Sequence, residues 1–175
     1  MLLVHVTESL LLPDMPKINA VAFISPSSNP VLVRSYAADA ENIKYHYLAH
    51  TSLDVIEERV AEANSSSYLG LLYSIEDVAV YGYQTPLKLK IVIAFALSDT
   101  VVRDAEVNAI FKALHMAYYY SAISNPFLKL DASPEATNDP SPYLLVGSSK
   151  WKNFRRRIDD ICSVVSNPSS SAGSS

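Results

Sequence analysis

Residues 68–97 read YLGLLYSIEDVAVYGYQTPLKLKIVIAFAL, and this stretch decides the fold. Aromatic, β-branched and leucine side chains fill it, and an acidic turn at Glu76-Asp77 interrupts it. The pattern predicts three consecutive strands, over 68–74, 78–84 and 87–97, that pair through short antiparallel turns. The last strand is apolar on both of its faces, which is typical of a strand covered on both sides.

Two more strands are predicted before this meander. Residues 18–25, INAVAFIS, are again apolar on both faces, and the turn cluster PSSNP separates them from a shorter strand over 31–36. Because the strands over 18–25 and 87–97 share this pattern, we expect them side by side at the centre of the sheet. The predicted fold is α+β: a five-stranded antiparallel sheet of order 2-1-5-4-3, with helices on both faces and the element order ββαβββαα.

Three helices complete the prediction, over 43–63, 103–123 and 150–165. Apolar residues recur in each at steps of three and four, which defines a buried stripe. The expected stripe of the first helix is Ile43, Tyr47, His50, Leu53, Ile56, Val60 and Ala63. The stripe of the second is Val107, Ile110, Leu114, Ala117 and Ser121, and that of the third is Trp151, Phe154, Ile158, Ile161 and Val165. Cys162 is expected to be a small core residue beside the third stripe.

The composition indicates one globular domain. The chain has 175 residues, of which 49% are hydrophobic and 18% charged, and its net charge is −4. An acidic balance argues against a general nucleic-acid binder, and a single cysteine excludes an internal disulfide or a cysteine-based zinc cluster. We expect residues 1–14 to lie outside the domain, which would span 15–165 with a proline-rich loop over 128–147, followed by a flexible serine-rich tail over 166–175.

One pattern resembles catalytic chemistry. His46, His50 and Asp54 stand at i, i+4 and i+8, so a helix places them on one face, and two histidines one turn apart can share a metal ion. A small metal-dependent hydrolase is therefore one alternative, although Tyr47 occupies the position at which a helical zinc protease carries its glutamate. In the other interpretation His46 is exposed, His50 packs beside the core stripe and Asp54 faces solvent or a partner. Glycine-rich phosphate loops and a Gly-x-Ser-x-Gly motif are missing, so we predict no catalytic residue, metal or cofactor.

Two further features allow more than one interpretation. The predicted third helix carries a cationic face, which is either solvated or contacts anionic lipid or an acidic partner. Its members are Lys150, Lys152, Arg155, Arg156 and Arg157. Gly70 and Gly82 lie within strands, where they either leave room for a large neighbour, such as a tyrosine of the adjacent strand, or allow a partner to approach closely.

Several motifs together resemble the sedlin family of trafficking protein particle (TRAPP) subunits, and within it the subunit 2-like branch. They are HTSLD at 50–54, YLGLLY at 68–73, ED at 76–77, VYGY at 80–83, RD at 103–104 and NPF at 125–127. The resemblance is strong over about residues 17–127 and weak over the last predicted helix. It implies a longin-like (SNARE-like) fold and a non-enzymatic adaptor in a multisubunit tether that acts as a Rab guanine nucleotide exchange factor in ER-to-Golgi and Golgi transport. The more basic third helix, the proline-rich loop and residues 1–14 depart from the family pattern.

The resemblance also implies partners and a place in the cell. Asp54 matches a family position linked to partner binding, and with it we take His50, Tyr68 and Tyr73 as candidate partner-binding residues; the edge strand over 68–74 could also receive a partner by backbone pairing. The expected partners are other TRAPP subunits, including a large one, and a Rab GTPase indirectly, but no nucleic acid. The expected location is the cytoplasm, peripheral at Golgi, ER–Golgi intermediate or vesicle membranes and perinuclear. Another longin-domain trafficking or coat-type scaffold is the alternative from the same class.

Overall fold

A computed structural model describes residues 16–37, 42–62, 66–97, 102–123 and 151–166. Its elements are β1 (Ile18–Ile24), β2 (Pro30–Ser35), α1 (Asn42–Glu62), β3 (Tyr68–Ile75), β4 (Val78–Gln84), β5 (Lys90–Ala96), α2 (Asp104–Tyr118), η2 (Tyr119–Ile123) and α5 (Lys152–Ser166). The predicted extension over 1–14, the loop over 128–147 and residues 167–175 of the predicted tail lie outside the described residues, whereas Ser166 is the last residue of α5. The domain boundaries therefore stay predictions.

The five strands form one antiparallel sheet in the order β2-β1-β5-β4-β3, so the predicted topology is confirmed. β1 and β5 lie side by side, as predicted, and both are buried along most of their length, as is β4 on the other side of β5. β5 begins at Lys90, later than the predicted 87. A tight turn accounts for the difference: the Thr85 N–H donates to the Leu89 carbonyl, and Lys88 adopts a left-handed φ of 61°.

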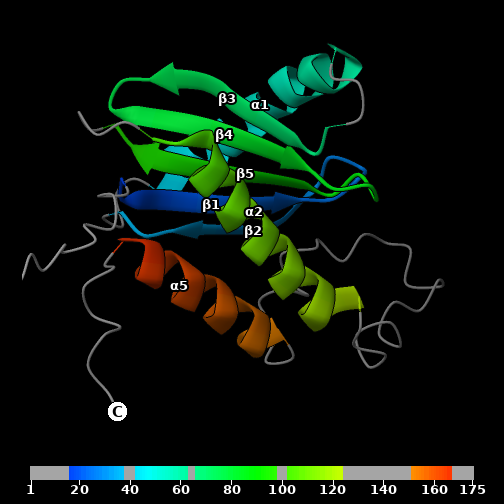
Figure 1. Cartoon of the computed structure of the whole chain (residues 1–175), viewed down its shortest axis with the longest axis vertical. Coiled ribbons are helices and arrows are strands. Elements are labelled where there is room, and N and C mark those ends of the chain that lie inside the picture. The colour runs from blue at the N-terminus through cyan, green and yellow to red at the C-terminus, as the bar shows by residue number, and fades with distance from the viewer. Residues whose placement is uncertain (1–15, 38–41, 63–65, 98–101, 124–150, 167–175) are drawn as a thin grey trace, which may run out of the picture.

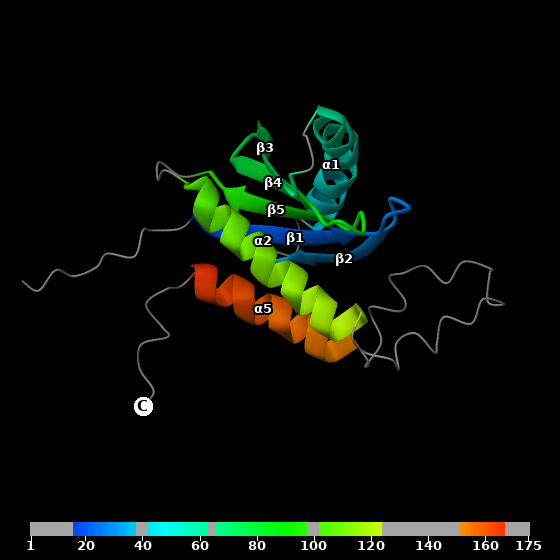
Figure 2. The same cartoon turned by 45° about the vertical axis from the view of Figure 1, so that its right-hand side comes forward.

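The molecule has three layers (Figures 1 and 2). α1 covers one face of the sheet, whereas α2 and α5 lie side by side on the opposite face. The prediction of helices on both faces is thus confirmed. Successive residues of a strand point to opposite faces, so each strand contributes to two separate cores.

The core beneath α2 and α5 is built from large side chains. Phe23 of β1 lies 6.0 Å from the ring of Tyr118 and 5.3 Å from that of Phe154, centroid to centroid. The predicted stripe of α2 is confirmed from Val107 to Ala117, with Phe111 added to it. In α5 the fully buried residues are Phe154, Ile158 and Cys162, so Cys162 is the small core residue expected of it.

The predicted stripe of α1 is wrong in its first half. Ile43 is 83% exposed and Tyr47 is 65% exposed. The residues that α1 buries against the sheet are Tyr45, Leu48, Ala49, Ser52, Leu53 and Ile56. The sheet surface beneath α1 is formed by small residues such as Ala20, Ala22 and Ala94, so a helix face that itself includes Ala49 and Ser52 can approach closely.

The two glycines within strands are required for different reasons. A Cβ atom at Gly82 would lie 2.9 Å from both terminal carbons of Leu72, so this glycine makes room for a neighbour on β3, which is a leucine rather than a tyrosine. Gly70 has open space around it but a φ of +72°, and it lies beside irregularities in the β3–β4 register. Gly70 is therefore a conformational glycine and Gly82 a packing glycine.

Candidate functional site

The outward face of α1 carries the predicted His46, His50 and Asp54. All three are exposed, and so are Ile43 and Tyr47 beside them. His50 was expected to pack beside the core stripe, but it lies one position beyond it because the stripe runs through Ala49 and Leu53. This half of α1 therefore presents apolar, imidazole and carboxylate groups together on an accessible helix face.

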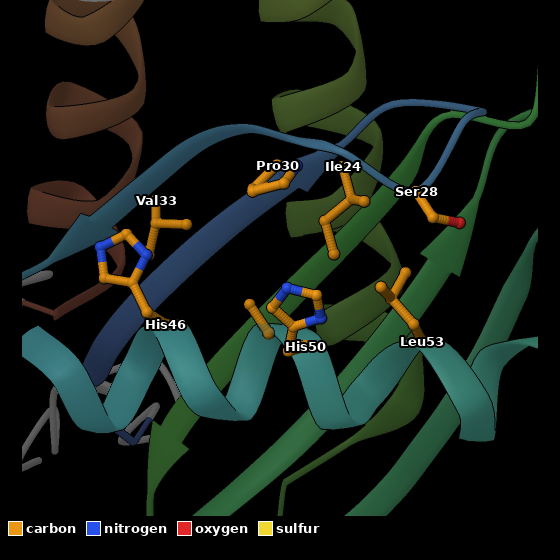
Figure 3. Close-up of a pocket in the computed structure, with 8 residues that line it drawn as sticks. Ile24, Ser28, Pro30, Val33, His46, His50 and Leu53 are labelled. Atoms are coloured by element: carbon orange, nitrogen blue, oxygen red, sulfur yellow. The ribbon is translucent and has the colours of Figure 1, made fainter. Parts of the chain in front are cut away.

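A groove opens between α1 and the β1–β2 hairpin (Figure 3). His46, His50 and Leu53 project from α1 towards the hairpin, and the volume between them is about 290 Å³. Its walls also include Ile24, Ser28, Pro30, Val33 and Ala49. Farther under the helix the packing is tight, and the next cavity has only about 10 Å³. The groove thus belongs to the hairpin end of α1, where the helix covers the sheet incompletely.

The hairpin turn that closes one end of the groove has a defined structure. The Ser25 N–H donates to the Asn29 carbonyl at 2.8 Å, and Ser28 adopts a left-handed φ of 63°. Behind Ser28, Lys90 Nζ donates to its Oγ at 3.2 Å. Lys90 is only 5% exposed, so an ammonium group lies buried next to this corner of the groove.

The second half of α1 is acidic on its exposed surface. Asp54, Glu57, Glu58 and Glu62 are all exposed, and none forms an ion pair with a described residue. By contrast, Lys44 is paired with Glu76 at 2.8 Å and with Asp77 at 3.4 Å in the β3–β4 turn, and these contacts raise its pKa, the hydrogen bond to Glu76 most. Asp54 therefore lies where the apolar half of the helix meets a cluster of unpaired carboxylates.

The two candidate tyrosines of β3 connect the sheet to opposite layers. Tyr73 donates from its hydroxyl to the Leu48 carbonyl of α1 at 2.9 Å and contacts the Ser52 hydroxyl at 3.1 Å. Tyr68 donates to the Asp104 carboxylate at the start of α2 at 2.7 Å. Burial is the main cause that raises the pKa of both phenols. Within the described residues, both hydroxyls are thus engaged in holding helices.

The backbone edge of β3 is poorly suited to strand addition. Its register with β4 shifts twice, between Tyr68 and Gly70 and between Leu71 and Tyr73. The Leu71 carbonyl also accepts a hydrogen bond from the Arg59 guanidinium at 3.3 Å. Bulges and side chains that cover the edge are the devices by which sheets prevent edge pairing. We therefore place the candidate site on α1 and not on β3.

The cationic residues of the last helix lie in different environments. Lys152, Arg156 and Arg157 are exposed and Arg155 is half-buried with an interaction of its own, whereas Lys150 lies outside the described residues. On the inner side of α5, Asp159 accepts two hydrogen bonds from Arg34, at 2.7 and 3.1 Å, and a third from the Tyr36 hydroxyl at 2.9 Å. Burial raises the pKa of the adjacent Cys162 thiol to about 11, so the reactive thiolate is scarce at neutral pH. This cluster links β2 to α5 and is structural.

Metal chemistry finds no support in the part of the chain that the structure describes. There, no three His, Cys, Asp or Glu side chains come together in a way that could hold a metal ion, so His46, His50 and Asp54 do not form such a group. Among the same residues, no helix is long and apolar enough to cross a membrane.

The hairpin side of the groove was not anticipated from the sequence. Val33, Pro30 and Ser28 acquire their role through tertiary contact with α1, and no local pattern indicates it. On the helix side a signal did exist: His46, Ala49, His50 and Leu53 follow steps of three, four and seven and place an alanine between two histidines. A small residue in such a stripe indicates either close packing or a gap.

Known proteins show similarity over most of the described core. The sequence profile of the Sedlin family matches residues 23–138. The chain is 39% identical to the mouse trafficking protein particle complex subunit 2-like protein over 113 residues, which cover 61% of this chain and 80% of that protein. It is 35% identical to the Dictyostelium discoideum protein of the same name over 128 residues, which cover 70% of this chain and 90% of the relative. The match includes α1, the groove and the whole meander.

Proposed function

Because this chain belongs to the Sedlin family, whose fold is longin-like, we propose that it is a non-enzymatic adaptor subunit of the TRAPP tethering complex. In this proposal it supports ER-to-Golgi and Golgi vesicle transport by binding other TRAPP subunits, a large one among them. It serves a Rab GTPase only through the exchange activity of the assembled complex. The observation that carries the proposal is the similarity to proteins named as TRAPP subunits.

The exposed face of α1 is the surface that we propose for this binding. It combines apolar side chains with polar groups at their margin, which is the usual composition of a protein interface. Ile43 and Tyr47 supply the apolar part, and His50 and Asp54 lie next to it, one helical turn apart. Asp54 also borders the unpaired carboxylates of the second half of α1, so a partner with a cationic group at this position gains a favourable contact.

Affinity purification of the tagged full chain from its source cells, followed by mass spectrometry, tests the proposal. We expect other TRAPP subunits in stoichiometric amounts. Recovery of the tagged chain without any of them would contradict the adaptor function.

A charge reversal on α1 tests the surface itself. We expect Asp54→Lys to weaken recovery of the large subunit at least tenfold, because a like charge then faces the partner cation. Glu62→Lys is the matched control: it makes the same charge change on the same exposed helix, away from the apolar half. Both variants should melt within about 2 °C of the wild type, because exposed substitutions of this kind change stability by about 0.5 kcal/mol or less. Equal losses in the two variants would remove Asp54 from the interface.

Membrane association is proposed to occur through the complex, at Golgi, ER–Golgi intermediate or vesicle membranes, with the chain itself cytoplasmic and perinuclear. Each cation near an anionic bilayer contributes about 1 kcal/mol. The exposed cations Lys152, Arg156 and Arg157 share the helix surface with the exposed Asp160, which offsets part of their attraction. We therefore expect the isolated chain to stay unbound in flotation with phosphatidylserine liposomes, and binding comparable to that of the whole complex would assign a membrane role to α5.

A further inference from the structure

The polar groups that line the groove between α1 and the β1–β2 hairpin share one character. They are the imidazoles of His46 and His50 and the hydroxyl of Ser28, all of which can donate hydrogen bonds. Among the described residues no carboxylate lines the groove, although exposed carboxylates are plentiful farther along α1. Imidazole and hydroxyl groups can donate to an anion, and the described lining places no negative charge against one.

Lys90 favours an anion at the corner of the groove that Ser28 forms. Its ammonium is buried and donates a hydrogen bond to the Ser28 hydroxyl, and no carboxylate of the described residues lies within ion-pair distance. A buried cation without a counter-ion is costly, and an anion that arrives beside it relieves that cost. Because Ser28 Oγ accepts from Lys90, the hydroxyl proton of Ser28 remains available to donate to a second group.

The size of the groove limits what else it binds. Its floor is apolar, formed by Ile24, Val33, Ala49 and Leu53 with Pro30, and its volume is about 290 Å³. This volume lies at the lower end of those that hold whole small-molecule ligands, and such pockets bury most of the ligand's surface. One or two apolar side chains of a protein partner fit this volume better than a cofactor does.

We propose that this groove binds a peptide segment of a partner in which a large apolar side chain stands close to an acidic residue. The apolar side chain occupies the floor between Val33 and Leu53, and the carboxylate lies at the Ser28 corner in front of Lys90. Glu57, one turn beyond Leu53 on α1, is negatively charged and would repel a carboxylate on the helix side of the groove. The partner's carboxylate is therefore placed on the hairpin side, near Lys90. The inference rests on the proposed function and names the chemistry of the partner segment.

Selection from a random dodecapeptide library displayed on phage, with the immobilised full chain as bait, tests this specificity. We expect enriched peptides to hold a large apolar residue and an Asp or Glu within about three positions of each other. His50→Trp places a bulky ring at the mouth of the groove and should lower the affinity of the best synthetic peptide at least tenfold in fluorescence anisotropy. Glu62→Gln, on the same helix away from the groove, should leave it unchanged. A consensus rich in lysine or arginine, no consensus, or equal affinity in the two variants would overturn the proposal.

A double-mutant cycle locates the carboxylate. Lys90→Met in the protein and Asp→Asn or Glu→Gln in the peptide should each lower affinity about tenfold, as expected for a hydrogen bond that involves a charged group, and together little more than either alone. Ser28→Gly is the second variant if Lys90→Met unfolds the chain: glycine keeps the left-handed φ of 63° and removes only the hydroxymethyl group. Strictly additive losses in the cycle would place the carboxylate elsewhere and refute the assignment.

The same variants separate this inference from the adaptor function. If the wild type recovers TRAPP subunits and His50→Trp recovers them equally well, the adaptor function stands and the groove assignment fails. If the selected peptide binds as expected but the wild type recovers no TRAPP subunit, the groove specificity stands and the adaptor function fails.

Discussion

The two faces of the sheet are built by the same strands but in opposite ways. Towards α2 and α5 the strands present large side chains, among them Phe23, Tyr81, Tyr83 and Phe95. Towards α1 they present several small ones, Ala20, Ala22 and Ala94, beside the larger Ile24, Leu69 and Leu72. The face with large side chains interlocks with aromatic rings from two helices, whereas the other face supports one helix and leaves a groove at its end. Dense packing is thus concentrated on one face, and the groove that we propose for recognition lies on the other.

Close packing explains how side-chain volume produces this division. Large residues that interdigitate across an interface gain many weak dispersion contacts and exclude voids. Small residues allow a helix backbone to come near the sheet but provide few atoms to fill the margin, so the space between α1 and the hairpin stays open. Ser52 and Tyr73 then fix the helix by hydrogen bonds where apolar contacts are fewer.

The largest expected effect is a truncation on the densely packed face. Phe23→Ala should lower the free energy of unfolding by about 3–5 kcal/mol, because it removes a ring that contacts both Tyr118 and Phe154 and leaves a cavity that the two helices cannot close. Leu48→Ala on α1 should cost less, about 2–3 kcal/mol, because a single helix can settle onto the small residues beneath it. Urea unfolding followed by circular dichroism measures both losses. A larger loss for Leu48→Ala would contradict the conclusion that the face towards α2 and α5 is the more densely packed one.

The next largest loss of stability is expected when a methyl group is added on the face of the sheet that α1 covers. Gly82→Ala should lower stability by about 1–3 kcal/mol, because its Cβ would meet Leu72 at 2.9 Å in a sheet where β4 is paired on both sides. Gly70→Ala is the companion variant, and it should cost about 1–2 kcal/mol through its left-handed φ alone. Leu72→Ala lowers stability by itself because Leu72 is buried, but in that background the further loss caused by Gly82→Ala should be smaller than in the wild type, whereas the further loss caused by Gly70→Ala should be unchanged, again by urea unfolding. A smaller further loss for both glycine variants would show that Gly70 is also limited by packing.

The tyrosine hydroxyls of β3 offer a smaller and more local comparison. Tyr73→Phe should cost about 1 kcal/mol because the Leu48 carbonyl and the buried Ser52 lose a partner, and it should speed hydrogen exchange in α1 more than in α2. Tyr68→Phe should cost less than about 1 kcal/mol, because its bond to Asp104 is exposed, and its effect on exchange should appear at the start of α2. Equal changes in both helices in either variant would mean that the two layers open as one unit.

The sequence predicted the sheet because each strand signal is local. Alternation, turn residues and two doubly apolar strands were sufficient for the order 2-1-5-4-3. The stripe of α1 was missed because two sets of residues follow helical spacing in its first half. Ile43, Tyr47 and His50 are exposed, and Tyr45, Leu48, Ala49 and Ser52 are buried in their place. Which set faces inward depends on the small residues of the sheet, a tertiary property that periodicity does not contain.

The candidate site was predicted only on its helix side, for the same reason. His46, His50 and Asp54 share a helix face by spacing alone, so their exposure together on α1 follows from the sequence. Ser28 and Lys90 are separated by sixty-two residues and meet through the hairpin and the start of β5. Only the folded chain brings this hydroxyl and ammonium to one corner.

The smallest expected effect concerns a charge on the densely packed face. His115 of α2 lies 6.1 Å from the ring of Tyr83, and burial lowers the pKa of its imidazole below the ordinary 6.5. The unfolded chain therefore binds a proton at His115 more readily than the folded chain, so His115 lowers stability as the pH falls through about 6.5 towards the folded-state pKa. His115→Gln should reduce the loss of stability between pH 7.5 and 5.5 in thermal unfolding, and NMR titration of the wild type should give a depressed pKa for His115. An unchanged pH profile in this variant would mean that water reaches the margin of the α2 layer and that the two faces of the sheet differ in packing but not in polarity.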